Sequence, residues 1–164
     1  MHKTLRLTLS VLAASLLLAG CGSDDQETPF KPVAFDKHDR CLVCGMVISH
    51  YEGPKAEVFI KGAEGEAVKF CSGRDAFSFA LQPENARRLK AFFIHDMARA
   101  DWAEPEDKYL IDATKAVYVV GSDTVGVMGP EPIAFSDPEK ARVFSQKHGG
   151  KVIAYKAVTL EVLD

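Results

Sequence analysis

Residues 66–70 read Glu-Ala-Val-Lys-Phe, and residues 131–135 read Glu-Pro-Ile-Ala-Phe. In each segment a glutamate, an aliphatic residue and a phenylalanine occupy alternate positions. Alternation of this kind is typical of a β-strand, because successive side chains of a strand point to opposite faces of the sheet. The two segments therefore predict equivalent strands in two copies of one structural unit.

A helical pattern follows each of these strands. Ser72 and Asp75 have the spacing of a capping box, and Pro138 suits the first position of a helix. The matching helix positions, separated by the same 65 residues as the strands, are Ala76 with Ala141 and Phe79 with Phe144. The duplication therefore extends from the strand into the helix.

Further strand-like runs occur at residues 56–60, 90–94, 116–120 and 151–155. Together these patterns predict an α+β fold of two similar strand-strand-helix-strand units, at about residues 41–103 and 114–164. A unit of this size buries too little surface to be stable alone, so the two units are expected to pack together through sheet and helix faces.

The loop between the first two strands differs between the units. The first strand recurs after 60 residues and the second after 65, so the loop of the second unit is about five residues longer. This loop, residues 121–130, contains Met128 among glycines and before Pro130. Methionine usually fills space in a core, but this setting leaves both a packing role and a ligand role open.

The amino terminus has the pattern of an export signal. Lys3 and Arg6 precede an apolar run, residues 7–18, that is too short to span a membrane well. The sequence Leu18-Ala-Gly-Cys21 resembles the bacterial lipoprotein signal, in which cleavage precedes the cysteine and its sulfur receives a diacylglycerol. We expect a signal peptide over residues 1–20 and lipidation of Cys21, with palmitate-like chains that hold the protein on a membrane, facing the periplasm.

Residues 21–36 are expected to form a lipidated, flexible tether, because they are polar, contain two prolines and show no periodicity. The 19 residues between Cys21 and Cys41 could extend to about 65 Å. Loss of Lys3 and Arg6 with the signal peptide leaves 18 basic residues against 23 acidic ones, a formal charge of −5. A mildly acidic chain without a basic stripe argues against nucleic-acid binding.

The segment Cys41-Leu-Val-Cys44-Gly-Met46 carries the most distinctive chemistry of the chain, with His38 before it and His50 after it. Thiolate, thioether and imidazole together form the ligand set that Cu(I) prefers, whereas a thioether is a poor ligand for zinc. The segment therefore indicates a copper site, although each histidine also fits an exposed loop residue. Cys71 is interpreted as a small buried thiol at a strand-to-helix junction, and Met97 as a packing residue.

The spacing of the cysteines leaves other roles open. Cys41 and Cys44 could be the active pair of a membrane-tethered thiol-disulfide oxidoreductase, or a structural disulfide in an inert scaffold. A thioredoxin-like pair lies at a helix start after a strand, and here a glycine follows Cys44 and no strand precedes Cys41. A structural zinc site usually has a second cysteine pair, whereas this chain adds only Cys71.

The lipoprotein signal, the tether, the segment from Cys41 to Met46, the run Gly53-Pro-Lys-Ala56 and the triplet Met128-Gly-Pro130 together resemble the NosL family of nitrous oxide reductase accessory lipoproteins. The resemblance covers nearly the whole mature chain. It implies a metallochaperone, not an enzyme, in which residues 37–164 bind one Cu(I). It also implies delivery of that copper to nitrous oxide reductase apoprotein and its maturation machinery during denitrification.

The same resemblance implies which side chains hold the metal. By motif position, Cys44 and Met128 are the principal copper ligands, and Met46 and Cys41 come next. His50 would complete a three-coordinate site. These roles follow from the resemblance and not from the spacing of the residues.

Overall fold

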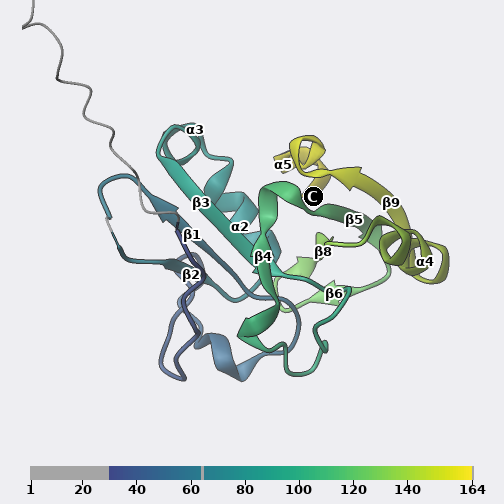
Figure 1. The fold of residues 1–164 in the computed structure, drawn as a ribbon, viewed down its shortest axis with the longest axis horizontal. Coiled ribbons are helices and arrows are strands. Elements are labelled where there is room, and N and C mark those ends of the chain that lie inside the picture. The colour runs from purple at the N-terminus through teal and green to yellow at the C-terminus, as the bar shows by residue number, and fades with distance from the viewer. Residues whose placement is uncertain (1–29, 64, 164) are drawn as a thin grey trace, which may run out of the picture.

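A computed structural model describes residues 30–63 and 65–163 (Figure 1). The predicted signal peptide, Cys21 and the tether as far as residue 29 lie outside the described residues. Within the described ranges, no helix has both the length and the apolar character needed to cross a membrane.

The first unit is a four-stranded antiparallel sheet with a helix on one face. The strand order is β2-β1-β3-β4. Its elements are β1 (Ala56–Ile60), β2 (Val68–Phe70), α2 (Gly73–Ala80), α3 (Pro83–Ala86), β3 (Leu89–His95) and β4 (Leu110–Asp112). Short 3-10 turns flank it at η1 (Ile48–His50), η2 (Asp107–Tyr109) and η3 (Ala113–Lys115).

The second unit repeats this order in a three-stranded sheet, β8-β5-β9, so the predicted strand-strand-helix-strand duplication is confirmed. Its elements are β5 (Val117–Ser122), β8 (Ile133–Phe135), α4 (Pro138–His148) and β9 (Gly149–Ala154). A small hairpin of β6 (Val125–Gly126) and β7 (Gly129–Pro130) lies in the long loop, and η4 (Tyr155–Ala157) and α5 (Leu160–Leu163) follow β9.

Equivalent side chains make equivalent contacts in the two units. The rings of Phe70 and Phe79 lie 5.3 Å apart, and the matching rings of Phe135 and Phe144 also lie 5.3 Å apart. Each pair joins the second strand of its unit to the helix that follows, so the match of strands and helices at one offset is confirmed.

The register of the first strand differs by one residue from the predicted one. Ala56 pairs with Phe70, whereas the partner of Phe135 is Val117 and not Ala116. The loop of the second unit is therefore four residues longer than that of the first, not five. Sequence alternation could not show this, because β5 is buried on both faces and its neighbouring residues Tyr118 and Val119 are equally inaccessible.

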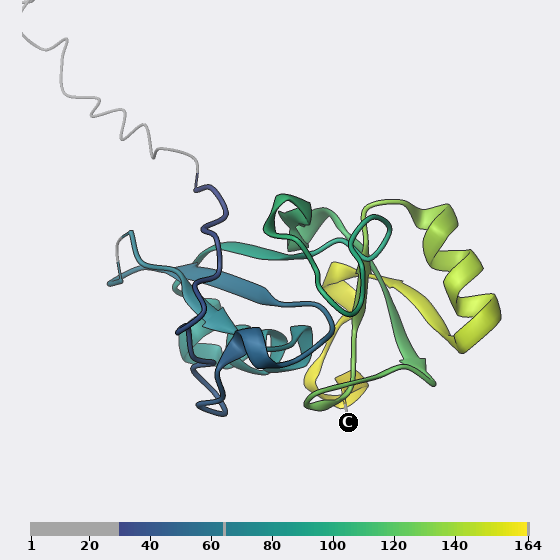
Figure 2. The ribbon, with the colours of Figure 1, turned by 90° about the horizontal axis from the view of Figure 1, so that it is seen from below.

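Helix α2 packs on the first sheet and reaches the second through Phe77, and α4 packs on the second sheet at the far end of the molecule (Figures 1 and 2). The Phe77 ring of α2 lies 5.0 Å from Phe92 in the first sheet and 5.1 Å from Tyr118 in the second. Tyr155 lies 5.7 Å from the same ring, at the end of β9. A single helix thus supplies the core that neither unit could complete alone.

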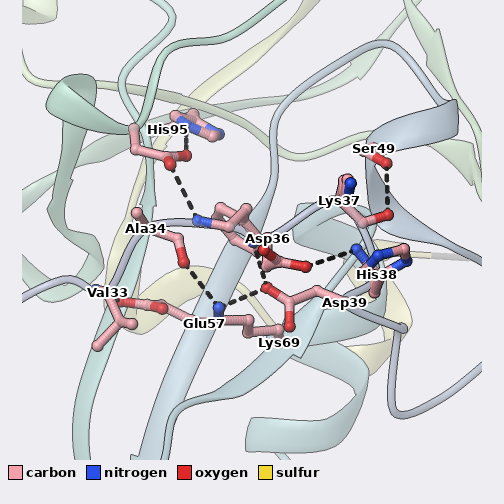
Figure 3. A network of polar contacts seen from close by, with 12 residues as sticks. Val33, Ala34, Asp36, Lys37, His38, Asp39, Ser49, Glu57, Lys69 and His95 are labelled. Atoms are coloured by element: carbon pink, nitrogen blue, oxygen red, sulfur yellow. Dashed lines mark hydrogen bonds and ion pairs between the residues drawn. The ribbon is translucent and has the colours of Figure 1, made fainter.

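Residues 30–36, here called the strap, lie on the face of the first sheet that points away from α2. The Phe30 ring packs 4.9 Å from Phe59, and the Val33 N–H donates to Glu57 Oε1 over 2.8 Å. Figure 3 shows this strap and the polar residues around Glu57. Residues 30–36 of the predicted tether therefore lie against the first sheet, because aromatic side chains in this polar stretch pack on an apolar surface.

Glu57 makes the contact of the strap sensitive to pH. Burial raises the pKa of its carboxyl to about 7 from the usual 4.5, and the Val33 N–H offsets only part of this shift. Because the pKa is higher in the folded protein, protonated Glu57 contributes fully to the free energy of unfolding below pH 4.5. That contribution is lost as the pH rises through about 7. Glu57→Gln stays neutral, so its free energy of unfolding should rise relative to wild type across this window, by about 3 kcal/mol in total.

Urea unfolding at several pH values checks this expectation. The control is Glu66→Gln, which makes the same substitution at an exposed position. A difference between Glu57→Gln and wild type that does not change between pH 4.5 and 7 would contradict the assignment.

Phe77→Ala should destabilise the protein by about 3–5 kcal/mol, because it opens a cavity between the two sheets. Phe144→Ala is the matched control, since this ring of the outer helix α4 is only half-buried and packs on Phe135 of β8. Denaturant unfolding of both variants should show a clearly larger loss for Phe77→Ala. Equal losses would mean that α2 does not join the two units in the way described.

Candidate metal centre

Four side chains from two separate segments converge on one point of the first unit. The ligand atoms of Cys41, Cys44, Cys71 and Asp75 all lie within 4.8 Å of one another. The three cysteines are free thiols. Among the described residues, this is the cluster of cysteine, histidine and acidic groups with the geometry to hold a metal ion.

A tight turn presents the first two cysteines. The Cys41 N–H donates to the Met46 carbonyl and the Gly45 N–H to the Cys41 carbonyl, each over 2.9 Å. Gly45 has a φ of 74°, a conformation that glycine adopts without strain. The Leu42 N–H donates to the Lys69 carbonyl of β2 over 3.1 Å, which fixes the turn beside the strand that leads to Cys71.

Cys71 and Asp75 stand at the start of α2. Cys71 follows the last residue of β2, and Ser72 is the N-cap of the helix. The Asp75 N–H donates a hydrogen bond to the Ser72 hydroxyl over 3.0 Å. Four residues separate Cys71 and Asp75, so their side chains lie on the same side of the first turn. The positive end of the helix dipole favours negative charge at this position.

Close contacts within the cluster shift the pKa values of its thiols and its carboxyl group. Cys41 Sγ lies 3.2 Å from Asp75 Oδ2, close enough to share a proton, and Cys44 Sγ lies 3.4 Å from Cys71 Sγ. The pKa of Cys41 falls to about 4, chiefly because the Cys71 thiol donates to it. Burial raises the pKa of Asp75 to about 6, and the contact with Cys41 raises that of Cys71. Cys41 is therefore the thiol that ionises most readily, and the Cys44 and Cys71 thiols beside it stay protonated.

Solvent reaches the cluster at one of its four residues. Cys41, Cys71 and Asp75 are 2%, 0% and 5% exposed, whereas Cys44 is only half-buried. Leu42 and Val43 in the same turn are exposed apolar side chains. A metal ion entering or leaving the cluster would therefore pass Cys44.

The other residues predicted for the site fall in two groups. Met46 and Met128 are half-buried and pack against the hydrophobic cluster that contains Cys41 and Cys71. His50 is exposed on η1 and lies outside the four-residue cluster, and His38 is exposed as well. Both methionines therefore pack on the core that also contains Cys41 and Cys71, whereas His50 lies at the surface.

Asp75 was not predicted as a site residue, and Cys71 was predicted only as a buried thiol. Cys71 is indeed fully buried, and it also belongs to the cluster. A capping box that directly follows a cysteine was the available signal, because it places the carboxyl at its third helical position one turn above that cysteine. Met97 packs beside Trp102 under the second sheet, so its predicted packing role is confirmed.

The geometry bears on the alternative functions. The pair of Cys41 and Cys44 lies in a turn and not at a helix start, unlike the arrangement of a thioredoxin-like enzyme. With Asp75, however, the cluster offers four ligand atoms, which is the number that a tetrahedral zinc site needs. The sequence argument against zinc, which counted cysteines alone, therefore does not hold for the folded protein.

Comparison with known proteins identifies relatives over nearly the whole chain. The sequence model of the NosL family matches residues 32–163. The copper-binding lipoprotein NosL of Stutzerimonas stutzeri is 35% identical over 164 residues, which cover 99% of this chain and 85% of that protein. The protein of the same name from Achromobacter cycloclastes is 34% identical over 157 residues, 94% of this chain and 81% of the relative.

Solved structures show the same fold. The crystal structure of the copper chaperone NosL from Shewanella denitrificans superposes with a TM-score of 0.79 at 38% identity, over 81% of this chain and 98% of that one. The solution structure of apo-NosL from Achromobacter cycloclastes gives a TM-score of 0.51 at 35% identity, over 66% of this chain and 87% of that one.

The sulfur positions predict which disulfide forms on oxidation. Treatment of the apo protein with diamide should link Cys44 to Cys71, whose sulfurs lie 3.4 Å apart, while Cys41 stays engaged with Asp75. Two thiols lose two protons and two electrons, and the diazene is reduced to a hydrazine. Non-reducing peptide mapping by mass spectrometry identifies the bond, and Cys71→Ser should abolish it. A dominant bond between Cys41 and Cys44 would contradict the geometry.

Proposed function

This chain belongs to the NosL family, and we propose that it is a Cu(I) carrier which supplies copper for the copper centres of nitrous oxide reductase. Two relatives bear the name copper-binding lipoprotein, and the Shewanella relative is described as a copper chaperone. The chain is accordingly a metal-binding protein and not an enzyme.

The observation that carries the proposal is the chemistry of the cluster. Three thiols meet in one buried place, and two methionines pack against the same hydrophobic cluster. Sulfur ligands of both kinds favour Cu(I), and a carboxylate and thiols alone would suit zinc as well. The thioethers are therefore what distinguishes a copper site from a zinc site here.

We propose Cys44 and Met128 as the principal ligands, with Met46 and Cys41 as further donors. Cys71 joins this set because its sulfur lies 3.4 Å from that of Cys44. His50 remains a candidate only for a site that rearranges on binding copper, because its side chain is exposed. Asp75 accepts the proton of a neighbouring thiol more readily than it would bind a soft ion.

The arrangement suits loading and release by ligand exchange. Cys44 is half-exposed, so a sulfur ligand of a partner can reach the metal there while the buried thiols still hold it. Cu(I) replaces the protons of the thiols it binds, and the preformed Cys41 thiolate lowers the number of protons that have to leave. Transfer to nitrous oxide reductase or its maturation machinery would thus need no unfolding of the carrier.

Lipid attachment at Cys21 would hold the carrier on a membrane, facing the periplasm. Because the strap packs on the first sheet, it shortens the distance that the chain can span between Cys21 and the folded part of the protein. From Cys21 to Phe30, the first residue of the strap, a fully extended chain spans about 30 Å, against about 65 Å from Cys21 to Cys41. We therefore expect the copper site to meet partners close to the membrane surface while the strap is seated.

Copper titration tests the proposal directly. The reduced protein should bind one Cu(I), with sulfur scattering in X-ray absorption spectra and much weaker binding of Zn(II). Met128→Ala should lower Cu(I) affinity, measured by competition with a chelator. The apo protein should lose less stability than the roughly 2–5 kcal/mol of a fully buried methionine, because Met128 is half-buried.

The contrary outcomes point to different errors. A large fall in the melting temperature of Met128→Ala with unchanged affinity would make Met128 a packing residue. A tight zinc site without a thioether ligand would overturn the copper assignment. Thiol-disulfide exchange activity that survives replacement of both Met46 and Met128 would favour the oxidoreductase alternative.

A further inference from the structure

Met128 occupies the tip of a small hairpin in the second unit. Val125 pairs with Pro130 and Gly126 with Gly129, so Val127 and Met128 form the two-residue turn between them. We call residues 125–130 the Met128 hairpin. The side chains of Val127 and Met128 pack against the hydrophobic cluster that contains Cys41 and Cys71. The ligand that the second unit offers therefore depends on where this hairpin is held.

Glu131 follows the hairpin directly and bonds to the helix that carries the first unit's site residues. Its Oε1 accepts the Gly73 N–H over 2.6 Å, at the first residue of α2. The Arg74 side chain also donates to the Pro130 carbonyl over 3.5 Å. The Met128 hairpin is thus fastened two residues from Cys71 and in the same helical turn as Asp75.

Two glycines leave room for this carboxyl group. A Cβ at Gly73 would lie 2.7 Å from Glu131 Oε1, and a Cβ at Gly126 would lie 2.7 Å from Oε2. The glutamate is only 2% exposed, and its Oε2 has no hydrogen-bond partner among the described residues. An apolar side chain would avoid the cost of burying this oxygen, so the bond to Gly73 is what the carboxyl group adds.

We propose that Glu131 is a positioning residue of the copper site, which acts by fastening the Met128 hairpin to the N-terminus of α2. In this way the hairpin that carries the thioether is held at the end of α2 that follows Cys71 and contains Asp75. The inference rests on the proposed function, because it assigns Glu131 a role through Met128 and none of its own toward the metal.

The test is a double-mutant cycle on Cu(I) affinity, with bathocuproine disulfonate as the competing chelator. Glu131→Ala should weaken binding about tenfold, the order of effect expected when a buried hydrogen bond is lost. Glu131→Gln keeps a carbonyl acceptor of the same length and should bind Cu(I) within about twofold of wild type. In the Met128→Ala background, Glu131→Ala should have no further effect, because the ligand that it positions is absent.

Gly73→Ala perturbs the same contact from the helix side. Its Cβ forces the carboxyl group away, whereas alanine itself suits a helix. Gly73→Ala should therefore reproduce the loss of affinity in the wild-type background and have no effect in the Met128→Ala background. Hydrogen exchange of the amides of residues 125–130 should speed up in Glu131→Ala and stay slow in Glu131→Gln.

Several results would overturn the proposal. Equal losses of affinity with and without Met128 would mean that Glu131 acts through the fold as a whole. A Glu131→Gln variant as weak as Glu131→Ala would mean that the acceptor bond is not the cause. If wild type binds Cu(I) and Met128→Ala binds it equally well, the role of Glu131 fails while the copper function stands. If wild type binds no Cu(I), the proposed function itself fails.

Discussion

Helix α2 is the element on which both halves of the molecule depend. Its Phe77 ring contacts an aromatic ring in each sheet, so the helix completes two cores at once. Because a buried helix cannot leave its first N–H groups unpaired, Ser72 caps one of them and Glu131 of the second unit accepts another. The packing that joins the units therefore also decides which side chains gather at the N-terminus of α2.

The site at that helix end combines burial with charge, and the two oppose each other. Three thiols and a carboxyl group within 4.8 Å cannot all ionise, so Cys41 ionises most readily while the pKa values of Cys44 and Cys71 are raised. Among the described residues, Lys55 is the lysine or arginine that is buried. Its ammonium group donates to two backbone carbonyls of the loop before it. A monovalent metal would neutralise charge here without the large solvation cost of a divalent ion.

Much of this organisation is visible in the sequence, because it depends on local chemistry and on repetition. The alternation in residues 66–70 and 131–135 and the recurrence of Ala76 and Phe79 indicated both units and both helices. The strap was missed because a polar, proline-containing segment looks like a free tether, and only the sheet face that carries Phe59 and Glu57 shows what it packs against. The register of β5 was missed by one residue because this strand is itself buried on both faces.

The sequence by itself determined the kinds of ligand atom, since Cys41, Cys44 and Met46 stand within six residues and need no fold to be near one another. Only the tertiary structure decided the rest of the site. Cys71 and Asp75 meet Cys41 and Cys44 because the turn at Leu42 hydrogen bonds to β2, and the segment that carries Met128 lies beside α2, where Glu131 accepts the Gly73 N–H. These contacts join segments 27 or more residues apart, and no local pattern encodes which buried donor and acceptor will meet.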